Sequence, residues 1–106
     1  WFTPRYLEKN PSEIDQIRQQ ILGTPVAGYV GCSEAIRRLN YLNRLSAIQK
    51  PTLIMVGADD YGTPVAASEA MHAQIKGSKL VVIPDAAHLS NIEQTQNFND
   101  NLITFL

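Results

Sequence analysis

The sequence has few of the features that several protein classes require. It holds a single cysteine, Cys32, so no disulfide can form within the chain, and a reducing cytoplasm is the expected compartment. The net charge is −1 and there is no basic block, which argues against nucleic-acid binding. No apolar run approaches the length of about 18 residues that a membrane-spanning helix needs, so no membrane partner is expected. The two histidines lie far apart, without a cysteine or an i, i+4 partner, and do not predict a metal site.

The start of the chain and its small number of strands predict that the sequence is part of a larger protein. It begins with Trp1 and Phe2 rather than with methionine, and its 106 residues can form one domain at most. Hydrophobic residues make up 44% of the sequence and charged residues 18%, a balance that predicts a folded chain. Only two stretches are typical of strands, and a two-stranded parallel sheet is marginal in isolation. We therefore expect the C-terminal part of an α/β protein, which associates with its missing N-terminal part or with another copy of the chain.

Two short apolar runs in the second half of the chain predict neighbouring parallel strands. The first run covers residues 52–56 and the second covers residues 80–83. Each is too short for a typical helix and lacks an alternation of apolar and polar residues, as expected for strands that are buried on both faces. Residues 65–76 between them predict a crossover helix, which Gly77 ends. The fold class is therefore α/β, built on a strand–helix–strand unit.

The first half of the chain shows helical patterns and no strand. Apolar residues on one stripe predict an amphipathic helix for which Ser12 is the N-cap. After the second strand, Asn91 predicts the N-cap of a terminal helix. The chain thus divides into a helical part over residues 1–44 and a strand–helix–strand–helix part over residues 45–106.

Polar residues follow each predicted strand at the point where the strand ends. Asp59 and Asp60 come after the first strand, where a carboxylate can accept a hydrogen bond from an imidazole and stabilise its protonated form. His88 follows the second strand among small residues, a suitable place for a general base. Because sites in parallel α/β sheets gather at the carboxyl ends of the strands, the acid and the histidine are expected to meet. Taken singly, the aspartates are also typical of a turn or a helix cap, and the histidine of a packed loop.

The two loops together are more specific than either alone. The pattern Gly57-x-x-Asp60-x-x-x-Pro64, followed by a helix, a strand and His88, resembles the C-terminal end of the α/β-hydrolase fold. Over essentially the whole chain the sequence also resembles the 3-oxoadipate enol-lactonase family. The phrases that carry this resemblance are Gly28-Tyr29-Val30-Gly31-Cys32, Thr63-Pro64 and Ala86-Ala87-His88-Leu89-Ser90-Asn91-Ile92-Glu93-Gln94, of which the last is the most specific to that family.

The resemblance implies a site and a reaction. Asp60 would be the acid of a catalytic triad and His88 its general base, while the serine nucleophile and the oxyanion hole would lie upstream of this sequence. Residues 1–44 would be the end of a helical cap, and residues 45–106 the end of the hydrolase core. The implied reaction is hydrolysis of a small molecule, 3-oxoadipate enol-lactone, to 3-oxoadipate in the β-ketoadipate pathway of aromatic-compound catabolism. No metal or organic cofactor is implied.

The resemblance also suggests residues that contact the substrate. Trp1 would sit in the cap near the substrate cavity. Arg37 and Arg38 are candidates to hold a substrate carboxylate, because a guanidinium group can pair with a carboxylate through two hydrogen bonds. The same two arginines are at least as typical of a solvated helix face.

Ser33 lies in a segment that matches a nucleophile elbow only in part. Residues 31–35 have the pattern small–x–Ser–x–small, but an elbow needs a buried strand before it, and residues 24–30 do not predict one. Cys32 in the same segment is typical of packing. We therefore expect the isolated chain to have no hydrolase activity. Two other functions stay open: an α/β-hydrolase that acts on another ester or on a C–C bond, and a non-catalytic binding module.

Overall fold

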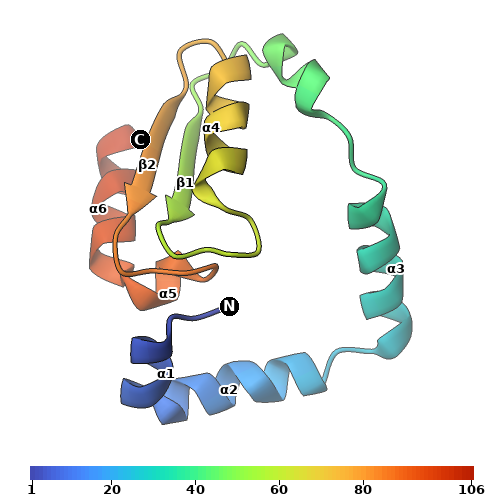
Figure 1. Cartoon of the computed structure of the whole chain (residues 1–106), viewed down its shortest axis with the longest axis vertical. Coiled ribbons are helices and arrows are strands. Elements are labelled where there is room, and N and C mark those ends of the chain that lie inside the picture. Colours follow the sequence, from blue (N-terminus) through green and yellow to red (C-terminus); the bar gives the residue numbers. More distant parts are fainter.

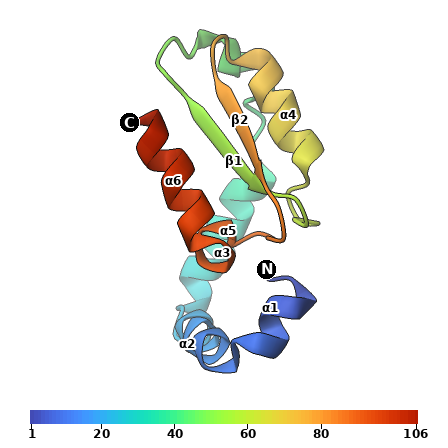
Figure 2. The same cartoon turned by 90° about the vertical axis from the view of Figure 1, so that its left-hand side faces the viewer.

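Two parallel strands form the only sheet in the computed structural model, which describes all of residues 1–106, and they lie between two helices (Figure 1). β1 (Leu53–Gly57) pairs with β2 (Lys79–Ile83) in parallel. α4 (Val65–Gln74) connects the two strands, and α6 (Thr95–Phe105) follows them. Figure 2 shows α4 and α6 on opposite sides of the strands. The predicted strand–helix–strand unit and the α/β class are therefore confirmed.

The buried core is small, and most of it lies at the carboxyl ends of the strands. Gly57 at the end of β1 pairs with Ile83 at the end of β2, and Ile83 is fully buried. The chain passes so close to Gly57 that a Cβ atom there would lie 2.2 Å from the carbonyl oxygen of Ala87 and 2.3 Å from that of Ala86. Only glycine leaves room for this approach. Because both alanines are themselves buried, the tightest packing lies directly beneath the loops that follow the two strands.

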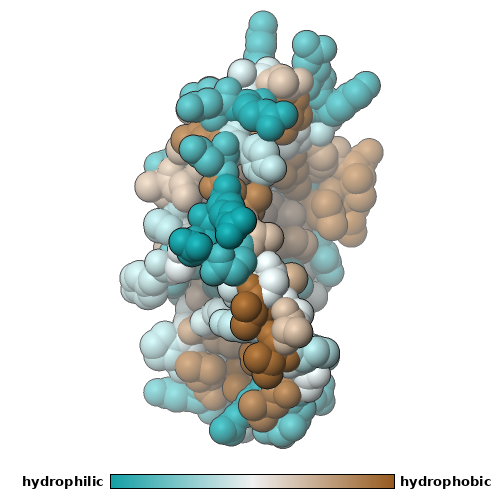
Figure 3. Space-filling view, turned by 90° about the vertical axis from the view of Figure 1, so that its right-hand side faces the viewer, coloured by the Kyte–Doolittle hydropathy of each residue, from teal (hydrophilic) through white to brown (hydrophobic).

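The first half of the chain forms an arm of helices that curves away from the strands (Figure 1). α1 (Pro4–Lys9), α2 (Pro11–Leu22) and α3 (Val26–Arg37) contain no buried residue, and the 3₁₀ helix η1 (Leu42–Ala47) leads back to β1. The face of the molecule on the α3 side carries clusters of exposed hydrophobic side chains (Figure 3). The large apolar residues of the arm that are more than half exposed are Trp1, Leu22, Val26, Tyr29, Val30, Ile36, Leu39 and Tyr41. No helix combines the length and the apolar character that crossing a membrane would require.

α2 begins earlier than predicted. Its first residue is Pro11 and its N-cap is Asn10, so the expected cap, Ser12, lies within the helix. A proline keeps the residue before it out of the helical region, and Asn10 accordingly has φ −128° and ψ 52°. The proline itself suits the first helical position because its φ is already fixed near the helical value.

The helices that flank β2 also differ from the prediction at their ends. α4 ends at Gln74 and not at Gly77, which has φ 76° in the turn before β2. Asn91 does not cap the terminal helix but lies inside a short additional helix, α5 (Ser90–Glu93). Gln94, with φ −129° and ψ 52°, then separates α5 from α6. The single terminal helix predicted from the sequence is therefore two helices.

Candidate active site

The loops that follow β1 and β2 are bonded to each other beyond the ends of the strands. The N–H of Ala58 donates to the carbonyl of Ile83 at 2.8 Å, and the N–H of Asp59 donates to the carbonyl of Ala86 at 2.9 Å. These two bonds extend the parallel pairing past the last strand residues. They hold the loop that carries the acid against the loop that carries the histidine.

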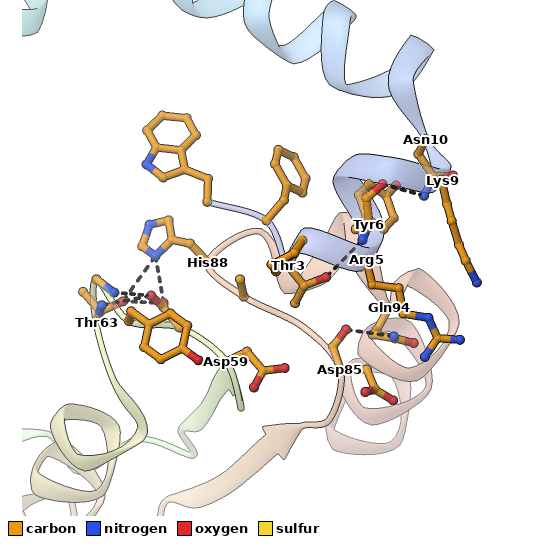
Figure 4. A pocket seen from close by; sticks show the side chains of 17 residues that line it. Thr3, Arg5, Tyr6, Lys9, Asn10, Asp59, Thr63, Asp85, His88 and Gln94 are labelled. Atoms are coloured by element: carbon orange, nitrogen blue, oxygen red, sulfur yellow. Dashed lines mark hydrogen bonds and ion pairs between the residues drawn. The ribbon is translucent and has the colours of Figure 1, made fainter.

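Asp60 and His88 form a hydrogen-bonded pair between these loops. Figure 4 shows His88 facing the loop that carries Thr63. The distance from Asp60 Oδ2 to His88 Nδ1 is 2.8 Å. Asp60 is buried, with 7% of the residue exposed, whereas 44% of the His88 side chain is exposed. Because an ionised carboxylate can only accept, His88 Nδ1 is the donor, and Nε2 is left free to take up a proton. The pair therefore has the geometry of an oriented general base.

Four donors surround the carboxylate of Asp60. Oδ1 accepts from the N–H of Gly62 at 2.9 Å and from the N–H of Thr63 at 3.0 Å, while Oδ2 accepts from the Thr63 hydroxyl at 2.7 Å and from His88. Burial by itself raises the pKa of Asp60. The hydrogen bonds from Thr63, His88 and Gly62 outweigh burial and lower this pKa from 3.8 to about 2. The acid is therefore ionised over the whole pH range in which a histidine acts as a base.

Thr63 is a site residue to which the sequence pattern assigned no role. Its hydroxyl donates to Asp60 Oδ2 and lies 3.3 Å from His88 Nδ1, so it touches both members of the pair. The only feature of the sequence that could have indicated Thr63 is its position three residues after an aspartate. At this spacing, side chains in turns and at helix starts contact one another. That spacing is common in loops, and it does not point to a site without the histidine beside it.

A cavity of about 870 Å³ lies beside the imidazole of His88. One wall is α1 with the residues before it, and the other wall is the pair of loops after β1 and β2 (Figure 4). Trp1 belongs to the first wall: its ring centroid lies 6.2 Å from that of His88, and its carbonyl accepts from the N–H of Leu89 at 3.2 Å. The structure thus brings Trp1, Asp60 and His88 together. The other polar residues of the lining are Thr3, Arg5, Tyr6, Lys9, Asn10, Asp59, Tyr61, Thr63, Asp85 and Gln94.

Arg37 and Arg38, the candidates to hold a substrate carboxylate, do not line this cavity. They lie at the end of α3 and pair with Glu34 at 2.9 Å and 3.7 Å, with 70% and 77% of their side chains exposed. Such pairs, three and four residues apart, form on one solvated helix face. The cations that do line the cavity are Arg5 and Lys9 on α1, and neither takes part in an ion pair. Their helical spacing of four residues is visible in the sequence, but the direction of α1 is not.

No serine or cysteine lines the cavity. Ser33 lies inside α3, with helix on both sides of it, and therefore does not sit on a strand-to-helix elbow. Cys32 is exposed on the same helix. No group of three or more His, Cys, Asp and Glu side chains could hold a metal ion. The site thus presents an acid and a base beside a cavity, and it needs a nucleophile to perform covalent catalysis.

Known sequences resemble the chain over almost its whole length. A family profile described as alpha/beta hydrolase fold matches residues 2–95. The 3-oxoadipate enol-lactonase 2 of Acinetobacter baylyi is 34% identical over 99 residues, which are 93% of this chain and 37% of that protein. The 3-oxoadipate enol-lactonase 1 of the same organism is 35% identical over 98 residues, which are 92% of this chain and 36% of that protein. The chain therefore spans little more than a third of the length of these relatives.

Solved structures also resemble the chain over almost its whole length. The enol-lactonase from Burkholderia xenovorans LB400 matches with a TM-score of 0.96 at 30% identity, over 99% of this chain and 40% of that chain. A hydrolase from Pseudomonas aeruginosa PA01 matches with a TM-score of 0.93 at 34% identity, over 99% of this chain and 39% of that chain. Est816, an N-acyl homoserine lactone degrading enzyme, matches with a TM-score of 0.79 at 29% identity, over 98% of this chain and 42% of that chain. The same arrangement of arm, strands and loops therefore occurs within these longer hydrolase chains.

Proposed function

The chain belongs to the alpha/beta hydrolase fold family, and on this basis we propose that it carries the acid and the base of a serine hydrolase that opens an enol-lactone. The observation that supports this proposal is the hydrogen bond between buried Asp60 and His88 at the edge of the cavity. Similarity to two 3-oxoadipate enol-lactonases favours 3-oxoadipate enol-lactone as the substrate. The product is then 3-oxoadipate, formed in aromatic-compound catabolism through the β-ketoadipate pathway.

The proposed first half of the reaction is attack by a serine hydroxyl on the lactone carbonyl carbon. His88 Nε2 takes the hydroxyl proton as the new O–C bond forms, and Asp60 stabilises the resulting imidazolium through Nδ1–H. The C–O bond of the ring then breaks, and the leaving enol oxygen receives the proton from His88. The opened molecule stays attached to the serine as an ester.

Water completes the proposed reaction. His88 Nε2 removes a proton from a water molecule as that water attacks the ester carbonyl carbon, and it returns the proton to the serine oxygen when the ester bond breaks. The carboxylic acid that forms releases its proton to solvent and leaves as a carboxylate, and its enol end converts to the ketone. One water is consumed for each lactone, and no metal or organic cofactor takes part.

In this proposal the serine and the oxyanion hole come from polypeptide outside this sequence. The source is the N-terminal part of the same enzyme or another copy of the chain. Two observations support an outside source: no serine lines the cavity, and large apolar side chains of the arm are exposed. Residues 1–44 are then the end of the cap and residues 45–106 the end of the core. A single cysteine agrees with a cytoplasmic location for the enzyme.

The association is tested by analytical ultracentrifugation. We expect the 106-residue chain to self-associate or to bind the N-terminal part of the enzyme when the two are mixed. A dilute chain that remains monomeric and unfolds cooperatively in urea would contradict this part of the proposal.

The cavity contains cations suited to the carboxylate of the proposed substrate. Arg5 and Lys9 line the wall formed by α1, and a guanidinium group binds a carboxylate through two parallel hydrogen bonds. Asp59 and Asp85 line the same cavity and would repel an anion from their side. The substrate carboxylate is therefore expected near α1, with the lactone ring beside His88.

A second candidate is hydrolysis of another lactone or ester. Similarity to Est816, an enzyme that degrades N-acyl homoserine lactones, favours it. Such a substrate would carry no carboxylate for Arg5 and Lys9 to bind. The charge of the preferred substrate therefore separates the two candidates.

The function is tested by comparing the 106-residue chain with the complete polypeptide encoded by its reading frame. We expect turnover of the enol-lactone by the complete polypeptide only, and a loss of about 10³-fold or more in His88→Ala. The control is His72→Ala, which removes the other histidine, on α4, and keeps the activity. Turnover by the isolated chain that Ser33→Ala abolishes would overturn the assignment of the nucleophile. Preference for a neutral ester over the anionic lactone would favour the second candidate.

A further inference from the structure

Glu93 joins two parts of the site that are far apart in the sequence. Its Oε1 atom accepts hydrogen bonds from the N–H and from the hydroxyl of Thr3, both at 2.7 Å. Its Oε2 atom accepts from the N–H of Ala87, the residue directly before His88. One carboxylate therefore ties the cavity wall in front of α1 to the loop that carries the base.

Residues 1–3 have further attachments to the same loop and to α1. The carbonyl of Trp1 accepts from the N–H of Leu89 at 3.2 Å, and the ring of Trp1 lies 6.2 Å from that of His88. The hydroxyl of Thr3 also accepts from the N–H of Tyr6 at 3.3 Å, which makes Thr3 the N-cap of α1. The contact between Thr3 and Glu93 thus fixes where α1 begins relative to the site.

The groups around Glu93 require that both oxygens of its side chain be acceptors. The N–H and O–H of Thr3 and the N–H of Ala87 are all donors, and a carboxylate can accept from all three. A glutamine here would turn its NH₂ group toward one of these donors, and one of the two attachments would be lost. The carboxylate also forms the stronger bonds, because its charge adds to the attraction.

We infer that Glu93 is a positioning residue that fixes His88 relative to the cavity wall. It acts through the backbone of Ala87 on one side and through Thr3 on the other, and it does not itself line the cavity. Its importance for turnover rests on the proposed role of His88 as the general base. Its effect on the position of Trp1 does not depend on that role.

The fluorescence of Trp1 provides a readout of this position. Trp1 is the one tryptophan of the chain, and a protonated imidazole in contact with an indole ring quenches its emission. The 106-residue chain is titrated with acid, and the part of the fluorescence change that is missing in His88→Gln is assigned to His88. The α-amino group of Trp1 and the carboxylate of Asp60 also lie beside these rings. Both groups are still present in His88→Gln, so their contributions to the fluorescence change are subtracted. The test variant is Glu93→Gln, and its control is Glu8→Gln, the same charge change at an exposed residue of α1.

We expect Glu93→Gln to lose most of the His88-dependent fluorescence change and Glu8→Gln to keep it. Thr3→Val, which removes only the hydroxyl at similar volume, should reduce the change, and Thr3→Ser should restore it. This second pair keeps the inference testable where Glu93→Gln fails to fold.

Three results would overturn the inference. They are a full fluorescence change in folded Glu93→Gln, equal changes in Thr3→Val and Thr3→Ser, and no His88-dependent change in the folded, unmodified chain. None of these measurements needs turnover. A failure of the proposed lactonase function is therefore distinguishable from a failure of the role inferred for Glu93.

Discussion

The Thr63 hydroxyl lies 2.7 Å from Asp60 Oδ2, the same carboxylate oxygen that receives the hydrogen bond from His88. Two side chains therefore converge on one oxygen, while the other oxygen is held by the backbone N–H groups of Gly62 and Thr63. The carboxylate cannot rotate without losing several of these bonds. Its plane is thus fixed before the imidazole acquires a second proton.

Replacing Thr63 with valine is expected to raise the pKa of Asp60 and to lower kcat about 10-fold, because a hydrogen bond to an ionised group contributes about 1.5–3 kcal/mol. Thr63→Ser keeps the hydroxyl and should keep most of the activity. The kcat is measured on the complete enzyme, and the pKa of Asp60 is followed by carboxyl-carbon NMR. An unchanged pKa and an unchanged kcat in Thr63→Val would show that the hydroxyl has no part in orienting the acid.

Asp60 should make the protein sensitive to acid in a defined pH range. Its pKa is about 2 in the folded chain against an ordinary value of 3.8, so the folded state favours the ionised form. A lowered carboxylate pKa stabilises the protein at pH values above the ordinary one, and this stability is lost as the pH falls from about 4 toward 2. The loss should amount to roughly 2 kcal/mol of the free energy of unfolding.

Urea unfolding at a series of pH values measures this loss. The variant Asp60→Asn should have a flatter dependence of the free energy of unfolding on pH over this range. The neighbouring variant Asp59→Asn is the control and should keep the dependence of the unmodified protein. Equal pH dependence in Asp60→Asn and the unmodified protein would rule out this carboxylate as its source.

Gly57→Ala should be destabilising and should displace the loop of His88. The new Cβ atom would lie 2.2 Å from the carbonyl oxygen of Ala87, a distance that requires the backbone to move. We expect a loss of about 1–3 kcal/mol or more in the free energy of unfolding, together with a loss of activity. Gly31→Ala is the control: nothing lies within 4 Å of its Cβ position, and alanine there should stabilise α3 by about 0.5–1 kcal/mol. Similar stabilities for the two variants would show that the loop has room at Gly57.

Arg5→Gln should raise the KM for the anionic lactone and leave the KM for a neutral ester nearly unchanged. The expected increase is about 10-fold, since one charge-assisted contact with a carboxylate is removed. Arg18→Gln, the same change on α2 outside this cavity, serves as the control. The measurement is steady-state kinetics of the complete enzyme with both substrates. An equal rise in KM for both substrates would mean that Arg5 does not bind the carboxylate of the anionic lactone.

Local patterns were enough to predict the strands, the crossover helix and the meeting of Asp60 with His88. Apolar runs without alternation occur where strands are buried on both faces, and parallel strands end at the same edge of a sheet. The helix ends were less predictable, because Pro11 moved the cap of α2 from Ser12 to Asn10 through its effect on the preceding residue.

The path of the helical arm decided which cations reach the cavity. In the sequence, Arg37 and Arg38 at the end of α3 look no different from Arg5 and Lys9 on α1, because all four are cations in helical segments. No residue of these helices is buried, so the apolar stripe of α2 does not specify how the arm lies relative to the strands. Only the tertiary structure separates the pair that lines the cavity from the pair that is bonded to Glu34.

The sequence by itself determined the α/β unit and its acid–histidine pair, because both depend on periodicity and on the shared end of two parallel strands. The tertiary structure alone decided what surrounds that pair. The contact between Thr3 and Glu93 joins residues 90 positions apart, and Thr63 gains its role only where it meets His88. Hydrogen bonds of this kind join side chains with no common sequence period, so they become visible only when the chain has brought the two loops and the start of the arm together.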